Sequence, residues 1–321
     1  MGLVAHPLVI AMTKTAILFP GQGAQTPGMG KDFAAACPES AALFAEANDI
    51  LGYDLRALCF EGPAETLTLT THAQPAIYVT SAAVTAALRS AGKLDDVVAA
   101  AGLSLGEYTA LWFAGAFSFA DGLRLVKKRG AAMQAASDAP PSGMVSLVGA
   151  DRDAAEKTAA AARGDGVLVV ANLNAPGQIV LSGDKEACAR VPEAAKAFGI
   201  RRAIPLQVAG AFHSPLMEPA RAALVEALDA TPMHDLRIPV VSNVTGKAVT
   251  TAADARALLA RQVVAPVLWE DSMKELGAMG IRRFIEPAPG AVLTALLRKN
   301  LTDIEASNFG TLVDLTGGAS A

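Results

Sequence analysis

The chain has 321 residues, of which 52% are apolar and 5% aromatic, and this predicts a globular protein with a large core of small and branched side chains. Its net charge of -4 at pH 7 gives no general attraction for nucleic acid or anionic lipid, so neither is an expected partner. The cysteines Cys37, Cys59 and Cys188 are odd in number and widely spaced, which indicates neither a disulfide framework nor a zinc site and fits a reducing cytoplasm. The histidines show no metal-ligand spacing either, and no metal is expected.

The first part of the chain predicts a strand after a short extension. Residues 1–12 are apolar but lack a basic segment and are interrupted by Pro7, so we predict a terminal extension and no signal peptide. No apolar run reaches the length of a membrane span, and no membrane is expected. Residues 15–19 form an apolar run that Pro20 and Gly21 end, which predicts a buried strand opening into a loop.

A second buried strand is predicted at 95–103, with helical stretches before it and a helix after it. Strands that alternate with helices favour a parallel sheet covered on both faces. We therefore predict an α/β fold in which 13–138 begins a large subdomain.

The character of the sequence changes near Ala139, where 140–143 contains two prolines and a glycine. From there the pattern predicts strand, helix, two strands joined across Pro176 and Gly177, helix and strand, which is the ferredoxin-like order. The predicted small subdomain, 139–206, is inserted into the large one, which resumes over 207–303. Residues 304–321 are expected to be a terminal extension.

Ser104 has glycines two positions away on each side, in Gly102-Leu103-Ser104-Leu105-Gly106. A serine flanked in this way, between a strand and a helix, is typical of a nucleophile elbow. The turn exposes the hydroxyl and places the Leu105 N–H at a helix N-terminus, where it can stabilise an oxyanion. The same pattern also arises by chance in a glycine-rich chain, so the motif alone is only moderately specific.

A serine nucleophile requires a base, and His213 is the candidate. It precedes Ser214 and Pro215, which predict the N-cap and first residue of a helix running to about Leu228. His213 is therefore expected on a loop at the edge of an element. A structural imidazole is the alternative, and for His72 and His234 it is the preferred interpretation.

Arg129 lies on a predicted helix from Phe119 to Ala136, with Ser118 as its N-cap. On a helical wheel it falls within the apolar stripe, four residues from both Leu125 and Met133. A buried guanidinium is costly unless it is paired, and its planar donors match a carboxylate. Two interpretations stay open: a site that binds a substrate carboxylate, and a structural salt bridge with an internal Asp or Glu.

With these residues assembled, the chain resembles malonyl-CoA:acyl carrier protein transacylases from Phe19 to about Leu301. The motifs that carry the resemblance appear in order along the chain: Phe19-Pro20-Gly21-Gln22-Gly23, Gln74-Pro75-Ala76, Gly102 to Glu107, Lys128-Arg129-Gly130, Asn172 to Gln178 and Ala211-Phe212-His213-Ser214. The resemblance implies an α/β-hydrolase-like large subdomain with a parallel sheet and an inserted ferredoxin-like small subdomain.

The resemblance also implies roles for individual residues. Ser104 would be the nucleophile and His213 the base, with the backbone N–H groups of Gln22 and Leu105 as the oxyanion hole. Arg129 would hold the malonyl carboxylate. The remaining implied residues orient or line the site: the Gln262 carbonyl orients the histidine, Gln74 lines the site, and Phe212 before the histidine accompanies malonyl rather than methylmalonyl.

The implied reaction has two steps, in which Ser104 takes malonyl from coenzyme A and the phosphopantetheine thiol of acyl carrier protein then takes it from Ser104. The expected partners are acyl carrier protein and a coenzyme A thioester, the expected oligomeric state is a monomer, and neither metal nor bound cofactor is needed.

Two positions depart from the family pattern. Leu103 stands where a histidine usually precedes the serine, and Ala288 replaces a glycine in a turn. Three alternatives to malonyl transfer remain at this stage: an acyl-thioester hydrolase, a loader of unbranched acyl groups, and a scaffold that binds a carrier protein without turnover.

Overall fold

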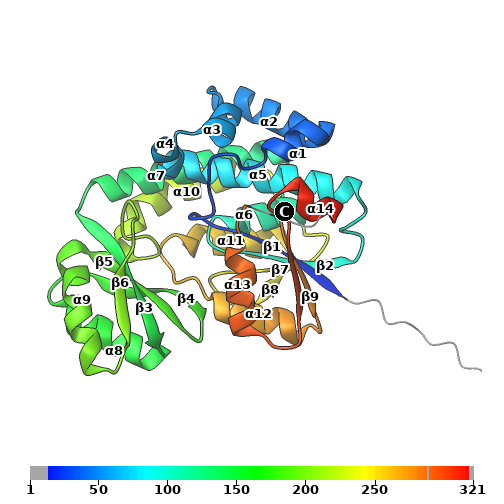
Figure 1. Cartoon of the computed structure of the whole chain (residues 1–321). Coiled ribbons are helices and arrows are strands. Elements are labelled where there is room, and N and C mark those ends of the chain that lie inside the picture. Colours follow the sequence, from blue (N-terminus) through cyan, green and yellow to red (C-terminus); the bar gives the residue numbers. More distant parts are fainter. Residues whose placement is uncertain (1–13, 288, 318–321) are drawn as a thin grey trace, which may run out of the picture.

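The computed structural model describes residues 14–287 and 289–317, and it shows an α/β protein with two sheets (Figure 1). The larger sheet has the strand order β10-β9-β1-β2-β7-β8. Its strands are β1 (Thr15–Phe19), β2 (Val97–Gly102), β7 (Val240–Val241), β8 (Ala248–Val249), β9 (Arg283–Glu286) and β10 (Glu305–Asn308). Every neighbouring pair is parallel except β7 with β8, so the predicted parallel sheet is confirmed apart from the edge strand β8.

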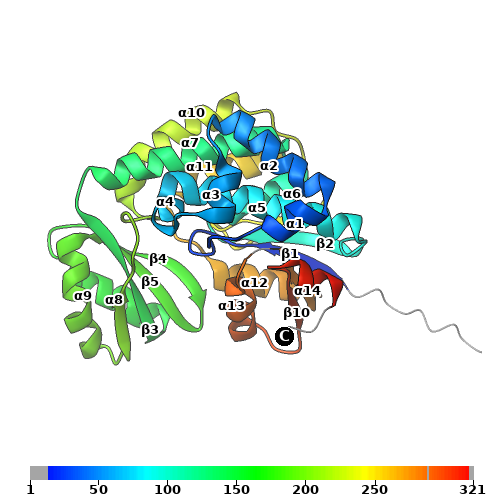
Figure 2. The same cartoon turned by 45° about the horizontal axis from the view of Figure 1, so that its top comes forward.

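Helices cover both faces of this sheet, so its central strand is buried throughout. Alternate residues of β1 point to opposite faces: Ile17 and Phe19 join one core cluster, and Ala16 and Leu18 join another. Helices of the first cluster include α2 (Pro38–Leu51), α5 (Thr70–Ser90), α6 (Gly106–Phe113), α7 (Phe119–Asp138), α10 (Glu218–Ala230) and α11 (Ala252–Gln262). Helices α12 (Trp269–Ala278) and α13 (Val292–Asn300) supply the second, on the other side of the sheet (Figure 2).

The short helices α1 (Lys31–Ala36), α3 (Leu55–Glu61) and α4 (Ala64–Thr68) connect β1 to α5 around α2. Among the described residues, no helix is both long and apolar enough to cross a membrane.

The smaller sheet is antiparallel, with the order β4-β5-β3-β6. Its strands and two helices are β3 (Ser142–Ala150), α8 (Arg152–Arg163), β4 (Leu168–Ala175), β5 (Gly177–Asp184), α9 (Lys185–Ala197) and β6 (Arg202–Pro205). This chain order and strand order are those of a ferredoxin-like unit, as predicted. The unit has its own apolar cluster, built from one face of the sheet and the two helices.

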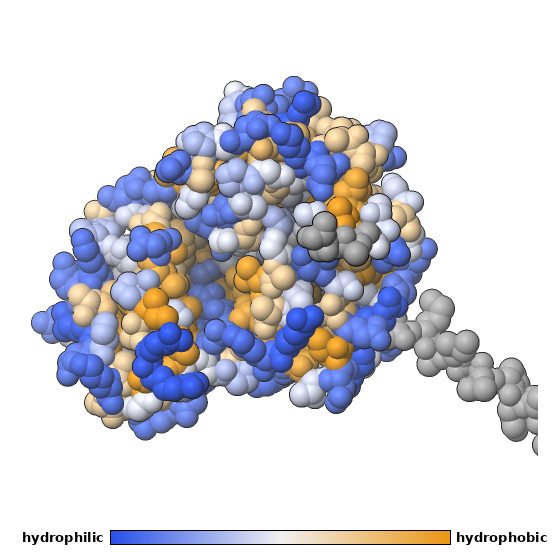
Figure 3. Space-filling view, viewed as in Figure 1, coloured by the Kyte–Doolittle hydropathy of each residue, from blue (hydrophilic) through white to orange (hydrophobic). Residues whose placement is uncertain are grey.

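Backbone hydrogen bonds join the small subdomain to the large one. The Leu173 N–H donates to the Val267 carbonyl at 2.9 Å, and the Val267 N–H donates to the Ala171 carbonyl at 2.8 Å. Strand β4 is thus fixed to the segment that follows α11. The surface is hollowed between the small subdomain and the larger body (Figure 3).

The prediction that 304–321 is a terminal extension is wrong for most of that segment. Strand β10 pairs in parallel with β9, and α14 (Leu312–Thr316) follows it. Phe309, Leu312 and Leu315 pack against the main core cluster. The segment was missed because β10, Glu-Ala-Ser-Asn, is a half-exposed edge strand without an apolar run. The predicted extension at 1–12 lies outside the described residues.

Candidate active site

Ser104 lies at a sharp turn between β2 and α6, with a backbone φ of 53°. A non-glycine residue in this left-handed region is strained and is held by its surroundings. The flanking glycines make the turn possible because backbone atoms approach them closely. A Cβ on Gly102 would lie 1.9 Å from the Gly106 carbonyl carbon, and one on Gly106 would lie 2.0 Å from the Phe19 carbonyl oxygen.

The two residues predicted to supply oxyanion donors, Gln22 and Leu105, come from different segments that meet at the turn. Leu105 is the N-cap of α6, and Gln22 lies in the loop after β1. That loop touches the turn, because a Cβ on Gly21 would lie 2.4 Å from the Leu103 carbonyl oxygen. Within the described part of the chain neither the Gln22 N–H nor the Leu105 N–H donates a hydrogen bond. Both donors are available for an oxyanion.

His213 occupies a loop just before the 3-10 turn η1 (Pro215–Met217), and its own φ is 58°. Its Nε2 lies 2.8 Å from Ser104 Oγ. Its Nδ1 lies 2.9 Å from the Gln262 carbonyl and 3.2 Å from the Ala265 carbonyl. Carbonyl oxygens only accept, so Nδ1 carries the proton and Nε2 is left as the acceptor of the serine proton.

Burial, and after it the nearby positive charge of Arg129, lower the pKa of His213 to about 4. The carbonyl hydrogen bonds to Nδ1 oppose this shift of the pKa. At neutral pH the imidazole is therefore uncharged, which is the state that a general base requires.

Arg129 is fully buried on α7, with its guanidinium beside the serine. One terminal nitrogen donates to Gln74 Oε1 at 2.8 Å, and the other donates to Ser104 Oγ and to Gln262 Oε1, each at 3.0 Å. The guanidinium also lies over the Tyr108 ring, 5.3 Å from its centroid. Among the described residues it forms no ion pair, so the structural salt bridge is not what holds it.

Two of the three glutamines named from the sequence, Gln74 and Gln262, are buried at this site. Gln74 accepts from Arg129, and its amide nitrogen lies 3.4 Å from the Met133 sulfur. Gln262 ends α11, and besides its carbonyl it uses its side chain: Nε2 donates to the Ser104 carbonyl at 2.8 Å and to Glu107 Oε2 at 2.6 Å. The sequence predicted the carbonyl contact and missed the side-chain contacts.

Two further buried polar residues, Asn243 and Glu107, contact the turn or its partners and were not predicted from the sequence. Asn243 Oδ1 accepts from the Ser104 N–H at 2.6 Å, and Asn243 Nδ2 donates to the Gly102 carbonyl at 2.7 Å. Burial raises the pKa of Glu107 to about 7, against hydrogen bonds from Gln262 and Asn243 that lower it. The signal for Glu107 was present, since it is the only charged residue in α6.

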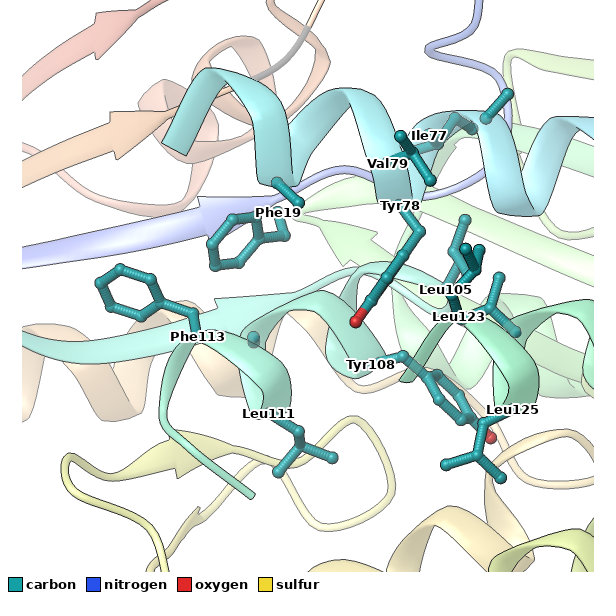
Figure 4. Packing of buried hydrophobic residues seen from close by; sticks show 14 of the residues in the cluster. Phe19, Ile77, Tyr78, Val79, Leu105, Tyr108, Leu111, Phe113, Leu123 and Leu125 are labelled. Carbon is teal, nitrogen blue, oxygen red and sulfur yellow. The ribbon is translucent and has the colours of Figure 1, made fainter. Parts of the chain in front are cut away.

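A cavity of about 530 Å³ opens in front of these groups. Its walls come from both subdomains. They include Gln22, Leu103, Ser104, Arg129, Met133, Asn172, Val180, Phe212 and His213. Figure 4 shows the side chains of Leu105 and Tyr108 packed within the main apolar cluster, near Leu123 and Leu125.

Leu103 packs partly against the apolar cluster on the far side of the sheet, and its N–H donates to the Phe19 carbonyl at 3.0 Å. The Ser104–His213 contact and the free N–H groups are present despite this departure from the family pattern. The second departure, Ala288, lies outside the described residues.

Residues 17–315 match the family model of the acyl transferase domain. The chain is 45% identical over 289 residues to the malonyl CoA-acyl carrier protein transacylase of Bacillus subtilis (strain 168), covering 90% of each chain. It is 40% identical over 296 residues to that of Escherichia coli (strain K12), covering 92% of this chain and 96% of the other.

Solved structures agree in fold. An acyl carrier protein S-malonyltransferase from Vibrio cholerae O1 superposes with a TM-score of 0.91 at 37% identity, covering 95% of this chain and 99% of the other. A malonyl-transacylase in complex with its type II PKS acyl-carrier protein does so with a TM-score of 0.91 at 36% identity, over the same shares. The chain belongs to the acyl transferase family and, within it, to the malonyl CoA-acyl carrier protein transacylases.

Proposed function

We propose that this protein transfers a malonyl group from malonyl-CoA to the phosphopantetheine thiol of acyl carrier protein, for fatty-acid or polyketide synthesis. One observation carries the proposal: a buried guanidinium nitrogen of Arg129 lies 3.0 Å from the Oγ of Ser104, whose other neighbour is a histidine. A cation beside the nucleophile selects an acyl group that bears a carboxylate, which disfavours a loader of unbranched acyl groups that lack one.

In the first half-reaction, His213 Nε2 takes the Ser104 proton while Oγ attacks the malonyl thioester carbon. The negative charge that develops on the thioester oxygen is stabilised by the N–H groups of Gln22 and Leu105. The carbon–sulfur bond then breaks, and coenzyme A leaves as a thiol with the proton held by the imidazolium. The product is malonyl-Ser104, whose carboxylate takes over the Arg129 donor that the hydroxyl occupied.

The second half-reaction runs the same steps in reverse. The phosphopantetheine thiol gives its proton to His213 and attacks the acyl-serine carbonyl, and Ser104 leaves as the alcohol. Serine and histidine supply the nucleophile and the base, so we propose that the exchange needs no metal or bound cofactor. The chemistry requires that the thiol, and not water, reaches the acyl-serine.

Phe212 bears on the choice between acyl groups. It is buried, it precedes His213, and it lines the cavity. We propose that its ring limits the space beside the malonyl α-carbon and so disfavours a methyl branch. Competition between malonyl-CoA and methylmalonyl-CoA for Ser104 measures this preference, and equal use of the two would contradict it.

We further propose that the protein is a cytoplasmic monomer. All three cysteines are free thiols, which suits a reducing compartment. The exposed large apolar side chains among the described residues include Leu69, Val98 and Val292, which come from separate parts of the fold. Light scattering of the purified chain measures the oligomeric state.

The decisive test of the function is mass spectrometry of the intact protein after incubation with malonyl-CoA. We expect a malonyl adduct on Ser104 that disappears when acyl carrier protein in its phosphopantetheine form is added. The Ser104→Ala variant should form no adduct, and acetyl-CoA should label the wild-type chain far less. An unchanged adduct on another residue in Ser104→Ala would exclude the proposed nucleophile.

A further inference from the structure

Glu107 is a buried carboxyl group that the proposed reaction does not use. Its side chain is 2% exposed, although it lies only three residues after the nucleophile. Among the described residues it forms no ion pair. Its Oε2 accepts from Gln262 Nε2 at 2.6 Å and from the Asn243 N–H at 3.3 Å. A polar group is stable in a buried position only if the free energy of its hydrogen bonds offsets the free-energy cost of removing it from water.

One of the two donors controls the nucleophile. Asn243 follows β7, the strand beside β2 in the sheet. Its side chain clamps the strained turn from below, because it accepts from the Ser104 N–H at 2.6 Å and donates to the Gly102 carbonyl at 2.7 Å. The clamp holds the backbone on both sides of Leu103, and it also occupies the Ser104 N–H, which leaves the oxyanion to other donors.

The other donor controls the base. The Gln262 carbonyl accepts from His213 Nδ1 at 2.9 Å, which orients the imidazole. The Gln262 side chain holds the Ser104 carbonyl at 2.8 Å. A displacement of Gln262 as a whole would therefore move the partner of the histidine and that of the serine together.

We propose that Glu107 is a positioning residue that sets the serine and the histidine relative to each other, through Asn243 and Gln262 respectively. In a serine triad a carboxylate touches the histidine directly. Here the backbone carbonyl of Gln262 contacts the histidine instead, and the carboxyl group of Glu107 holds the side chain of that same glutamine. The inference rests on the proposed function, because its readout is acyl transfer through Ser104.

Three variants test the inference. Glu107→Gln keeps an oxygen that accepts from both donors, and Glu107→Leu removes the acceptor at similar volume. Glu286→Leu is the matched control, since Glu286 is 1% exposed and accepts from the N–H groups of Leu293 and Thr294 at 2.9 and 2.8 Å, away from the cavity. Each variant is first checked for a folded state by circular dichroism and thermal unfolding.

We expect Glu107→Leu to lower kcat for malonyl transfer by about 100-fold with a much smaller change in KM, the scale expected when reacting groups are misplaced by about 1 Å. Glu107→Gln should retain most of the wild-type kcat. Glu286→Leu should lose stability and keep its kcat per folded molecule. Rates are expressed per reactive serine, titrated with a serine-directed covalent inhibitor.

A second measurement reads the geometry directly. The ¹⁵N signals of labelled His213 report which ring nitrogen carries the proton. Nδ1 should be protonated in the wild type and in Glu107→Gln, and the two tautomers should mix in Glu107→Leu.

Two results would overturn the inference while leaving the proposed function intact. One is a loss of kcat in Glu107→Gln as large as in Glu107→Leu, which would show that the charge matters and the hydrogen bonds do not. The other is a kcat in Glu107→Leu within a few-fold of wild type. Failure of the wild-type chain to form malonyl-Ser104 would instead overturn the proposed function.

Discussion

The imidazole of His213 lies between a cation and two carbonyl oxygens, and burial together with the cation sets its low proton affinity. Its pKa of about 4 has a kinetic consequence. If His213 is the base, as proposed, it is inactivated only by protonation of the imidazole, so acylation should stay constant from pH 8 down to about 5 and fall as the pH decreases through about 4. Single-turnover acylation by malonyl-CoA at each pH measures this profile. An acid limb near 6.5 would show that the site does not lower the pKa.

Arg129 is both the proposed carboxylate ligand and a cause of that shift. Arg129→Ala removes the cation, so the pKa of His213 should rise from about 4 toward its ordinary value. The variant should also lose preference for malonyl over acetyl by about 10- to 150-fold, since hydrogen bonds to charged groups contribute about 1.5–3 kcal/mol. NMR titration of His213 measures the change in its pKa. Competition between malonyl-CoA and acetyl-CoA measures the change in preference.

Lys128→Ala is the matched control for that experiment. It removes a neighbouring positive charge from the exposed face of α7. It should change neither the pKa of His213 nor the preference for malonyl over acetyl. If Arg129→Ala keeps the malonyl preference, the carboxylate ligand is misassigned.

Ser104, His213 and Arg129 could be proposed from the sequence because each has a local signature: a glycine-flanked turn, a histidine before a helix start, and a cation within an apolar stripe. Glu107 and Asn243 have weaker local signatures. What makes them part of the site is contact with partners 136 to 155 positions away in the chain. Such contacts depend on strand order, which composition and periodicity do not specify.

At the scale of elements, the turn around Ser104 depends on the close approach of β1 to α6. Gly106→Ala would place a Cβ 2.0 Å from the Phe19 carbonyl oxygen, so the helix or the strand must shift. We expect a loss of about 1–3 kcal/mol in the free energy of unfolding, as for other overpacked sites, with slower acylation of Ser104. Urea unfolding and single-turnover kinetics measure the two effects.

Gly143→Ala provides the comparison, because a Cβ there meets no atom within 4 Å. Stability and acylation should both stay near wild type. Equal losses in the two variants would show that the close approach at Gly106 is not the cause.

Elements with strong local signals were predicted well. The helix over 119–136 is observed as α7, and its N-cap Ser118 accepts from the Asp121 N–H at 3.1 Å. The helix predicted from Pro215 is instead a 3-10 turn followed by α10. The two-residue strands β7 and β8 have no periodicity to detect.

At the scale of the whole molecule, the C-terminal segment completes the main sheet and part of its core. Deletion of residues 305–321 removes the pairing of β10 with β9 and the apolar contacts of Phe309, Leu312 and Leu315. Full burial of one such side chain contributes about 1.5–3 kcal/mol, so we expect the truncated chain to lose at least about 2 kcal/mol of stability. Denaturant unfolding measures the difference.

Val313→Ser in the full-length chain is the control for the deletion, since Val313 is 45% exposed. It should leave the unfolding midpoint almost unchanged. A truncated chain as stable as wild type would mean that the segment adds nothing to the core.

The insertion of the small subdomain has a consequence for how the protein is made. Ser104 and His213 are 109 positions apart, and Gln262 follows Ser104 by 158. A ribosome adds roughly 5–20 residues per second, so the nucleophile emerges many seconds before the base and its carbonyl partner. A nascent chain that ends after β6 carries the serine without any means of activating it. We therefore expect translation products that end before His213 to be inert toward thioesters, because they lack the proposed base.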